Sequence, residues 1–268
     1  MSAPFYFGES GRALFGLLHG RDDETPGSGQ GLLLCAPLLQ DGIRAHRALW
    51  ALAQAVGSYG IPTLTFDWYG SGDSDGTDTE LTFDGMLGDL QQASAELLNR
   101  GATQLQWLAL RSAALPLLAF LARRSTPADV VLWDPQLDGA RLVEGWRLQH
   151  REQLHGAGRY VNARHESDSG ELLGFGVDDA LLDSLSLLDA AQLTLPRGSR
   201  VRMAVWEMDD ELDRFAREQR ANGVSVEAVL LEEGERPEWN VPSRFGGQVF
   251  PRRAVAQLAQ RMTAQVPW

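Results

Sequence analysis

The chain has 268 residues, 44% of them hydrophobic, and a formal net charge of −12 at pH 7. This length suits one large domain with its own core, and so acidic a surface disfavours binding to nucleic acid or to anionic membranes. The one cysteine, Cys35, excludes an intrachain disulfide. No apolar stretch approaches the ~18 residues of a membrane span, and the N-terminal residues lack a signal-peptide pattern, so a cytoplasmic protein is expected.

The first elements predict a hairpin followed by alternating strands and helices. Residues 4–9 and 13–19 form two apolar runs around the short turn SGR, and the run GLLLCAP is typical of a strand buried on both faces. Further along the chain we expect helices at 46–60, 81–101, 112–124, 210–223 and 252–262, and strands at 61–67, 105–110, 129–134, 200–208 and 224–233. Such alternation predicts an α/β fold, with a mostly parallel central sheet and helices on both faces.

The alternation is interrupted between residues 137 and 195, where the signals are helical. We therefore expect a core domain made of residues 1–136 and 196–268, with a helical cap insertion at 137–195 after about the sixth strand. An insertion at that point can cover the carboxyl ends of the strands, where open α/β sheets bind their ligands.

A glycine-rich stretch, TFDWYGSGDSDG, occupies residues 65–76. Its glycines permit turns with positive φ, and Asp67 and Ser74 can form hydrogen bonds with the loop backbone. The spacing differs from the dinucleotide-binding pattern G-x-G-x-x-G, and the aspartates lack the spacing of a calcium-binding EF-hand loop. We therefore predict no cofactor and no metal ion at this loop.

The pattern F-D-x-x-G-x-G-x-S in this stretch resembles the loop after the fourth strand of α/β-hydrolases. Together with LCAPLLQDGIRAHRALWALAQAV, LALRSAALPLLA and LWDPQLDGARLVEGWRLQHREQL, it resembles the hydrolase family associated with the exosortase A system, second type. The resemblance covers nearly the whole chain. It implies an α/β-hydrolase fold and a setting near bacterial exopolysaccharide and protein-sorting functions, but no particular substrate.

Hydrolases of this fold carry their nucleophile in G-x-S-x-G, on a sharp turn that needs small residues two positions before and after it. If Ser112 stood at the turn, one flanking residue would be Leu110, which is too large. If Arg111 stands there, the flanking residues are Ala109 and Ala113, and both fit. The small-residue rule therefore places arginine where the nucleophile is expected, and makes Ser112 an ordinary first residue of the helix.

The catalytic histidine of this fold follows the last strand, but the five histidines of this chain all lie at or before position 165. The segment WEMDDEL supplies Asp209 or Asp210 as a candidate acid, although surface solvation explains these charges equally well. A histidine of the predicted insertion, at position 150, 155 or 165, is the alternative base.

The backbone donors that stabilise an oxyanion can be retained in a protein that has lost its catalytic triad. The first turn of a helix offers free N–H groups, and since proline cannot donate, Leu38 or Leu39 must supply the second donor from the loop APLLQDG. Arg111 would add a fixed positive charge there, with Arg44 close by. This pattern predicts a site for a carboxylate or phosphate. The alternative is that Arg111 turns away and pairs with a carboxylate such as Asp134 or Asp67.

Two functions remain open at this point. The first is a hydrolase-like protein with a degenerate triad, which binds a small anionic or acyl ligand in an exopolysaccharide-associated pathway. The second is an active serine ester or thioester hydrolase that uses Ser112. An interaction scaffold is a third option because the chain has eight tryptophans, but Trp50, Trp107, Trp133 and Trp206 lie at positions expected in the core. The oligomeric state is left open.

Overall fold

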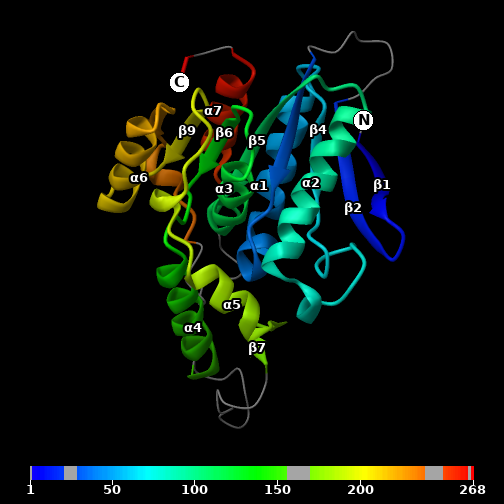
Figure 1. The fold of residues 1–268 in the computed structure, drawn as a ribbon, viewed down its shortest axis with the longest axis vertical. Coiled ribbons are helices and arrows are strands. Elements are labelled where there is room, and N and C mark those ends of the chain that lie inside the picture. Colours follow the sequence, from blue (N-terminus) through cyan, green and yellow to red (C-terminus); the bar gives the residue numbers. More distant parts are fainter. Residues whose placement is uncertain (1, 21–28, 156–169, 239–249, 265–266) are drawn as a thin grey trace.

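The structure is a computed structural model that describes residues 2–20, 29–155, 170–238, 250–264 and 267–268. A central eight-stranded sheet is packed between two layers of helices (Figure 1). Across the sheet the strands follow the order β1 (Ser2–Glu9), β2 (Arg12–His19), β4 (Thr63–Phe66), β3 (Gln30–Cys35), β5 (Gln104–Leu110), β6 (Asp129–Trp133), β9 (Arg200–Val205) and β10 (Ser225–Leu230). Only the pairs that involve β2 are antiparallel, so the predicted mostly parallel sheet is confirmed.

Helices cover the two faces of the sheet because each carries an apolar stripe at helical spacing. One face packs against α1 (Leu39–Gly57) and α7 (Arg252–Met262). The other packs against α2 (Phe83–Asn99), α3 (Ala114–Ala122) and α6 (Asp210–Ala221). Short 3₁₀ turns occur at η1 (Asp78–Glu80), η2 (Arg111–Ala113) and η5 (Glu233–Glu235). The central strands are buried on both faces, which explains their continuous apolar runs.

Between β6 and β9 the chain forms α4 (Gly139–His155), the short hairpin β7 (Glu171–Leu172) and β8 (Phe175–Gly176), α5 (Asp179–Ser186) and the turn η4 (Ala190–Gln192). Of these elements, α4, α5 and the hairpin gather at one end of the molecule (Figure 1). The hairpin differs from the helical expectation, since two-residue strands are too short to show a period of two in the sequence. The division of the chain into core and cap domains stays a prediction.

Three of the four tryptophans expected in the core, Trp107, Trp133 and Trp206, are buried. The expectation for Trp50 is wrong, because this residue of α1 is 48% exposed. The loop expected at residues 20–30 lies mostly outside the described residues. Within the described part of the chain, no helix is long and apolar enough to cross a membrane.

A fully buried histidine in β2 makes the stability of the fold depend on pH. Burial lowers the pKa of His19 from 6.5 to about 4. A depressed folded-state pKa means that protonation opposes folding, so the stability is complete above pH 6.5 and falls as the pH drops towards 4. We expect the free energy of unfolding to decrease by up to about 3 kcal/mol across this window, and His19→Gln to remove much of the decrease.

Urea unfolding at pH 7.5, 6, 5 and 4 measures this effect. The matched control is His155→Gln, because His155 is an exposed histidine at the end of α4. Parallel pH profiles for the two variants would show that His19 does not carry the dependence.

Candidate functional site

The turn between β5 and α3 has the geometry of a nucleophile elbow. Arg111 is the first residue after β5, and its φ of 51° lies in the left-handed region that non-glycine residues rarely adopt. The residues two positions away, Ala109 and Ala113, are fully buried, so there is no room for larger side chains. Arginine therefore occupies the strained position of this turn.

Arg111 is held by two carboxylates from the segments that follow the neighbouring strands β3 and β6. Its Nε lies 2.8 Å from Asp41 Oδ2, at the start of α1, and its Nη1 lies 2.9 Å from Asp134 Oδ2, directly after β6. Burial on its own lowers the pKa of the guanidinium, but the two carboxylates outweigh it and hold the pKa above its usual value. The sequence left open whether Arg111 pairs with a carboxylate, and the structure pairs it with Asp134 and Asp41 rather than with Asp67.

Ser112 follows Arg111 and is fully buried. Its Oγ accepts a hydrogen bond of 2.9 Å from the backbone N–H of Leu38, the donor that the sequence assigned to an oxyanion. Among the described residues, no histidine or carboxylate forms a hydrogen bond with this hydroxyl. Ser112 therefore occupies one of the two predicted oxyanion donors, and none of the described residues acts as a base to it.

Asp209 caps the N-terminus of α6, where its Oδ1 accepts a hydrogen bond of 2.9 Å from the N–H of Leu212. Asp210 is the first residue of the same helix. The cap explains an aspartate at this position without a catalytic histidine, since N-cap carboxylates stabilise helices by about 0.5–2 kcal/mol. A catalytic role for Asp209 stays a prediction.

The described histidines of the insertion are engaged elsewhere. His150 Nδ1 accepts a hydrogen bond of 3.0 Å from the N–H of Leu173, and His155 Nδ1 lies 2.7 Å from the carbonyl oxygen of Arg151. The third candidate base, at position 165, lies outside the described residues.

The insertion is docked onto the start of α1 through Gln40. Gln40 Nε2 donates to the carbonyl oxygen of Leu173 at 2.7 Å, and its Oε1 accepts from Gln153 Nε2 at 2.8 Å. Arg44 Nη2 also donates to Gln40 Oε1, at 3.2 Å. Arg44 therefore takes part in the contact with the insertion.

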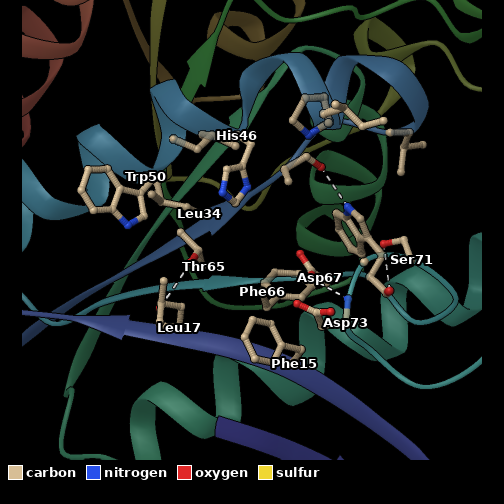
Figure 2. A pocket seen from close by; sticks show the side chains of 18 of the residues that line it. Phe15, Leu17, Leu34, His46, Trp50, Thr65, Phe66, Asp67, Ser71 and Asp73 are labelled. Carbon is tan, nitrogen blue, oxygen red and sulfur yellow. Dashed lines mark hydrogen bonds between the residues drawn. The ribbon is translucent and has the colours of Figure 1, made fainter. Parts of the chain in front are cut away.

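A cavity of about 530 Å³ lies beside the elbow, between α1, β2, β4 and the loop that follows β4 (Figure 2). Its size is within the range of small-molecule sites. Leu38 and Leu39 line it, whereas Arg111 and Arg44 do not. The four residues predicted to bind one ligand therefore fall into two groups. Two of them form part of the cavity wall, and the two arginines make polar contacts outside it.

The loop after β4 forms the polar end of this cavity. Gly70, Gly72 and Gly76 adopt positive φ angles of 79°, 57° and 89°, as their sequence predicted. Asp67 Oδ2 accepts from the N–H of Asp73 at 2.9 Å, and the carbonyl oxygen of Asp67 accepts from the Ser74 hydroxyl. These contacts hold the Asp67 carboxylate against the cavity.

Burial raises the pKa of the Asp67 carboxyl, and the hydrogen bond from Asp73 and the charge of His46 oppose part of this rise. His46 reaches the same cavity from α1, and Figure 2 shows both side chains at it. Sequence reasoning missed His46, and it considered Asp67 only as a loop residue and as an alternative partner of Arg111. The sequence shows a histidine in one predicted helix and an aspartate after the next predicted strand. That these two residues meet becomes evident only once α1 is placed beside β4.

The strand order and the strained turn at Arg111, between β5 and α3, correspond to an α/β-hydrolase fold. No protein-family model matches the chain, and no curated protein sequence matches it.

Solved structures support the same fold. The chain is similar to the Pyrococcus furiosus esterase Pf2001, with 12% identity over 98% of this chain and 90% of the esterase and a TM-score of 0.64. It is also similar to Est1E from Butyrivibrio proteoclasticus, in a structure with ferulic acid bound, with 12% identity over 97% and 98% of the two chains and a TM-score of 0.61. An α/β serine hydrolase without a lid from Xanthomonas campestris has 14% identity over 98% and 92%, with a TM-score of 0.54.

Proposed function

We propose that this protein is an α/β-hydrolase-like ligand-binding protein with a degenerate triad. Arginine takes the place of the nucleophile, and no histidine follows position 165. The observation that carries the proposal is the buried ion-pair cluster at the elbow, in which Arg111 bridges Asp41 and Asp134. Two carboxylates keep the Arg111 guanidinium protonated, and a protonated, delocalised guanidinium has no lone pair available to attack a carbonyl carbon.

The cavity next to the elbow is the proposed ligand site. Its walls are mainly apolar, which favours a small ligand with an acyl-like body. An anion at Arg111 also stays a prediction, but it would have to displace Asp41 or Asp134, because one guanidinium and two carboxylates already sum to a negative charge. An apolar ligand in the cavity requires no such exchange.

We place this binding function in an exopolysaccharide- or exosortase-associated pathway of bacteria. The support is the resemblance of the motifs around Trp68, Arg111 and Trp133 to the family named above. We therefore expect bacteria that contain this protein also to export polysaccharide.

Labelling with a fluorophosphonate probe tests the proposal, since the probe reacts with activated serines. We expect no labelling of the folded wild-type protein, and no difference between it and Ser112→Ala, because Ser112 has no base within hydrogen-bonding distance among the described residues. Circular dichroism establishes that both proteins are folded, and an active esterase of the same fold serves as the positive control. Labelling that disappears in Ser112→Ala would instead establish the serine ester or thioester hydrolase.

A further inference from the structure

The two ends of the cavity differ in chemistry. Apolar side chains of β2, β3 and α1, among them Leu17, Leu34 and Trp50, form its body, while Asp67 and Asp73 stand together at the loop end (Figure 2). A ligand that fills this space therefore needs an apolar body and one polar end.

Asp67 has an unused acceptor at this polar end. One carboxylate oxygen, Oδ2, accepts from the N–H of Asp73, and Oδ1 has no hydrogen bond to any described residue. A ligand that fills the cavity excludes water from this oxygen, so the ligand must supply a donor to avoid leaving a buried carboxylate oxygen without a hydrogen bond.

The one cationic side chain among the described residues that acts on the two aspartates is His46, whose charge opposes part of the rise in the pKa of Asp67. Neither Asp67 nor Asp73 forms an ion pair with a described arginine. Arg47 also lines the cavity, but its guanidinium carbon lies 5.5 Å from the centre of the Phe250 ring, towards α7. From α1 the titratable side chain that acts on Asp67 is His46, while β2 and β4 contribute uncharged residues.

We infer that the cavity binds a primary amine with an apolar acyl or aryl body, whose ammonium group donates a hydrogen bond to Asp67. Charge-assisted hydrogen bonds are roughly twice as strong as neutral ones, and Asp73 adds a second negative charge. The ring of Phe15 also lines the cavity, and aromatic rings attract cations. The inference rests on the proposed function, because it names the ligand class of the proposed site.

Three probes with the same body and different end groups test the inference: 4-phenylbutylamine, 4-phenylbutanol and 4-phenylbutanoate. Isothermal titration of the full chain at pH 7.5 measures their affinities. We expect the amine to bind about tenfold more tightly than the alcohol, with the carboxylate weakest. Asp67→Asn should reduce the affinity for the amine to that for the alcohol, because asparagine keeps an acceptor for the Asp73 N–H but loses the charge.

Two further variants separate the contributions of site and charge. Leu17→Trp fills the cavity from β2 and should weaken all three probes. Asp84→Asn removes one exposed carboxylate on α2, which packs on the opposite face of the sheet, and should leave the preference for the amine unchanged.

The outcomes distinguish the inference from the proposed function. Equal affinities for the three probes, all weakened by Leu17→Trp, would overturn the ammonium assignment and retain the cavity as a ligand site. Amine binding that is insensitive to Leu17→Trp would overturn both. An amine preference that survives Asp67→Asn, or binding of none of the probes at millimolar concentration, would overturn the ammonium assignment, and the serine labelling would still test the proposed function on its own.

Discussion

Replacing Arg111 by alanine is expected to destabilise the protein by about 3–5 kcal/mol, because the change leaves two carboxylates without their cation in a buried site. The side chain of Asp41 is 4% exposed and that of Asp134 19%, so water solvates the charge of Asp41 poorly and that of Asp134 only in part. Urea unfolding at pH 7.5 measures the loss. The matched control is Arg123→Ala, since Arg123 is exposed and lies 3.9 Å from an exposed Asp84, a contact worth at most about 1 kcal/mol.

A variant in which the whole cluster is neutral distinguishes the destabilisation caused by buried charge from that caused by lost packing. The triple variant Arg111→Met, Asp41→Asn, Asp134→Asn removes all three charges at similar volume, and it should recover most of the stability lost in Arg111→Ala. A loss below about 1 kcal/mol in Arg111→Ala would show that the cluster is not the buried network that its distances indicate. The proposed function would then lose its main support.

The second large effect is expected at Gly139, the first residue of α4. A β-carbon there would lie 1.8 Å from the carbonyl oxygen of Leu185 and 3.0 Å from that of Leu188, and backbone atoms cannot yield as a flexible side chain does. The N–H of Gly139 also donates to the Leu188 carbonyl at 2.8 Å, so the two segments must approach this closely. We expect Gly139→Ala to destabilise the protein by about 1–3 kcal/mol, the usual cost of overpacking.

Gly145, in the same helix, provides the control, because no atom lies within 4 Å of a β-carbon at that position. Gly145→Ala should be neutral or stabilise the protein by up to about 1 kcal/mol, since alanine favours the helix. Thermal unfolding combined with limited proteolysis shows whether Gly139→Ala exposes α4 and α5 to cleavage. Equal behaviour of the two variants would contradict the close approach of α4 to the end of α5.

Local patterns predicted most of the fold. Runs such as GLLLCAP and the apolar spacing of α2 and α6 reflect burial. A strand covered on both faces is apolar throughout, and a helix covered on one side repeats its apolar residues about every 3.6 positions. The hairpin of β7 and β8 escaped this reasoning, because two residues cannot display a period.

The sequence by itself determined the position of the elbow. Small residues at 109 and 113 leave one register for the turn, and the positive φ of Arg111 agrees with that register. The absence of a histidine after position 165 also follows from the sequence alone. These conclusions depend on steric limits and on chain order, which a sequence contains directly.

Only the tertiary structure decided which side chains meet. Asp41 and Arg111 are 70 residues apart, and they pair because β3 and β5 are neighbours whose carboxyl ends lie at the same edge of the sheet. His46 and Asp67 share a cavity for a similar reason, since α1 packs beside the end of β4. An ion pair or a cavity wall depends on distances of a few ångströms between separate elements, and no periodicity along the chain specifies those distances.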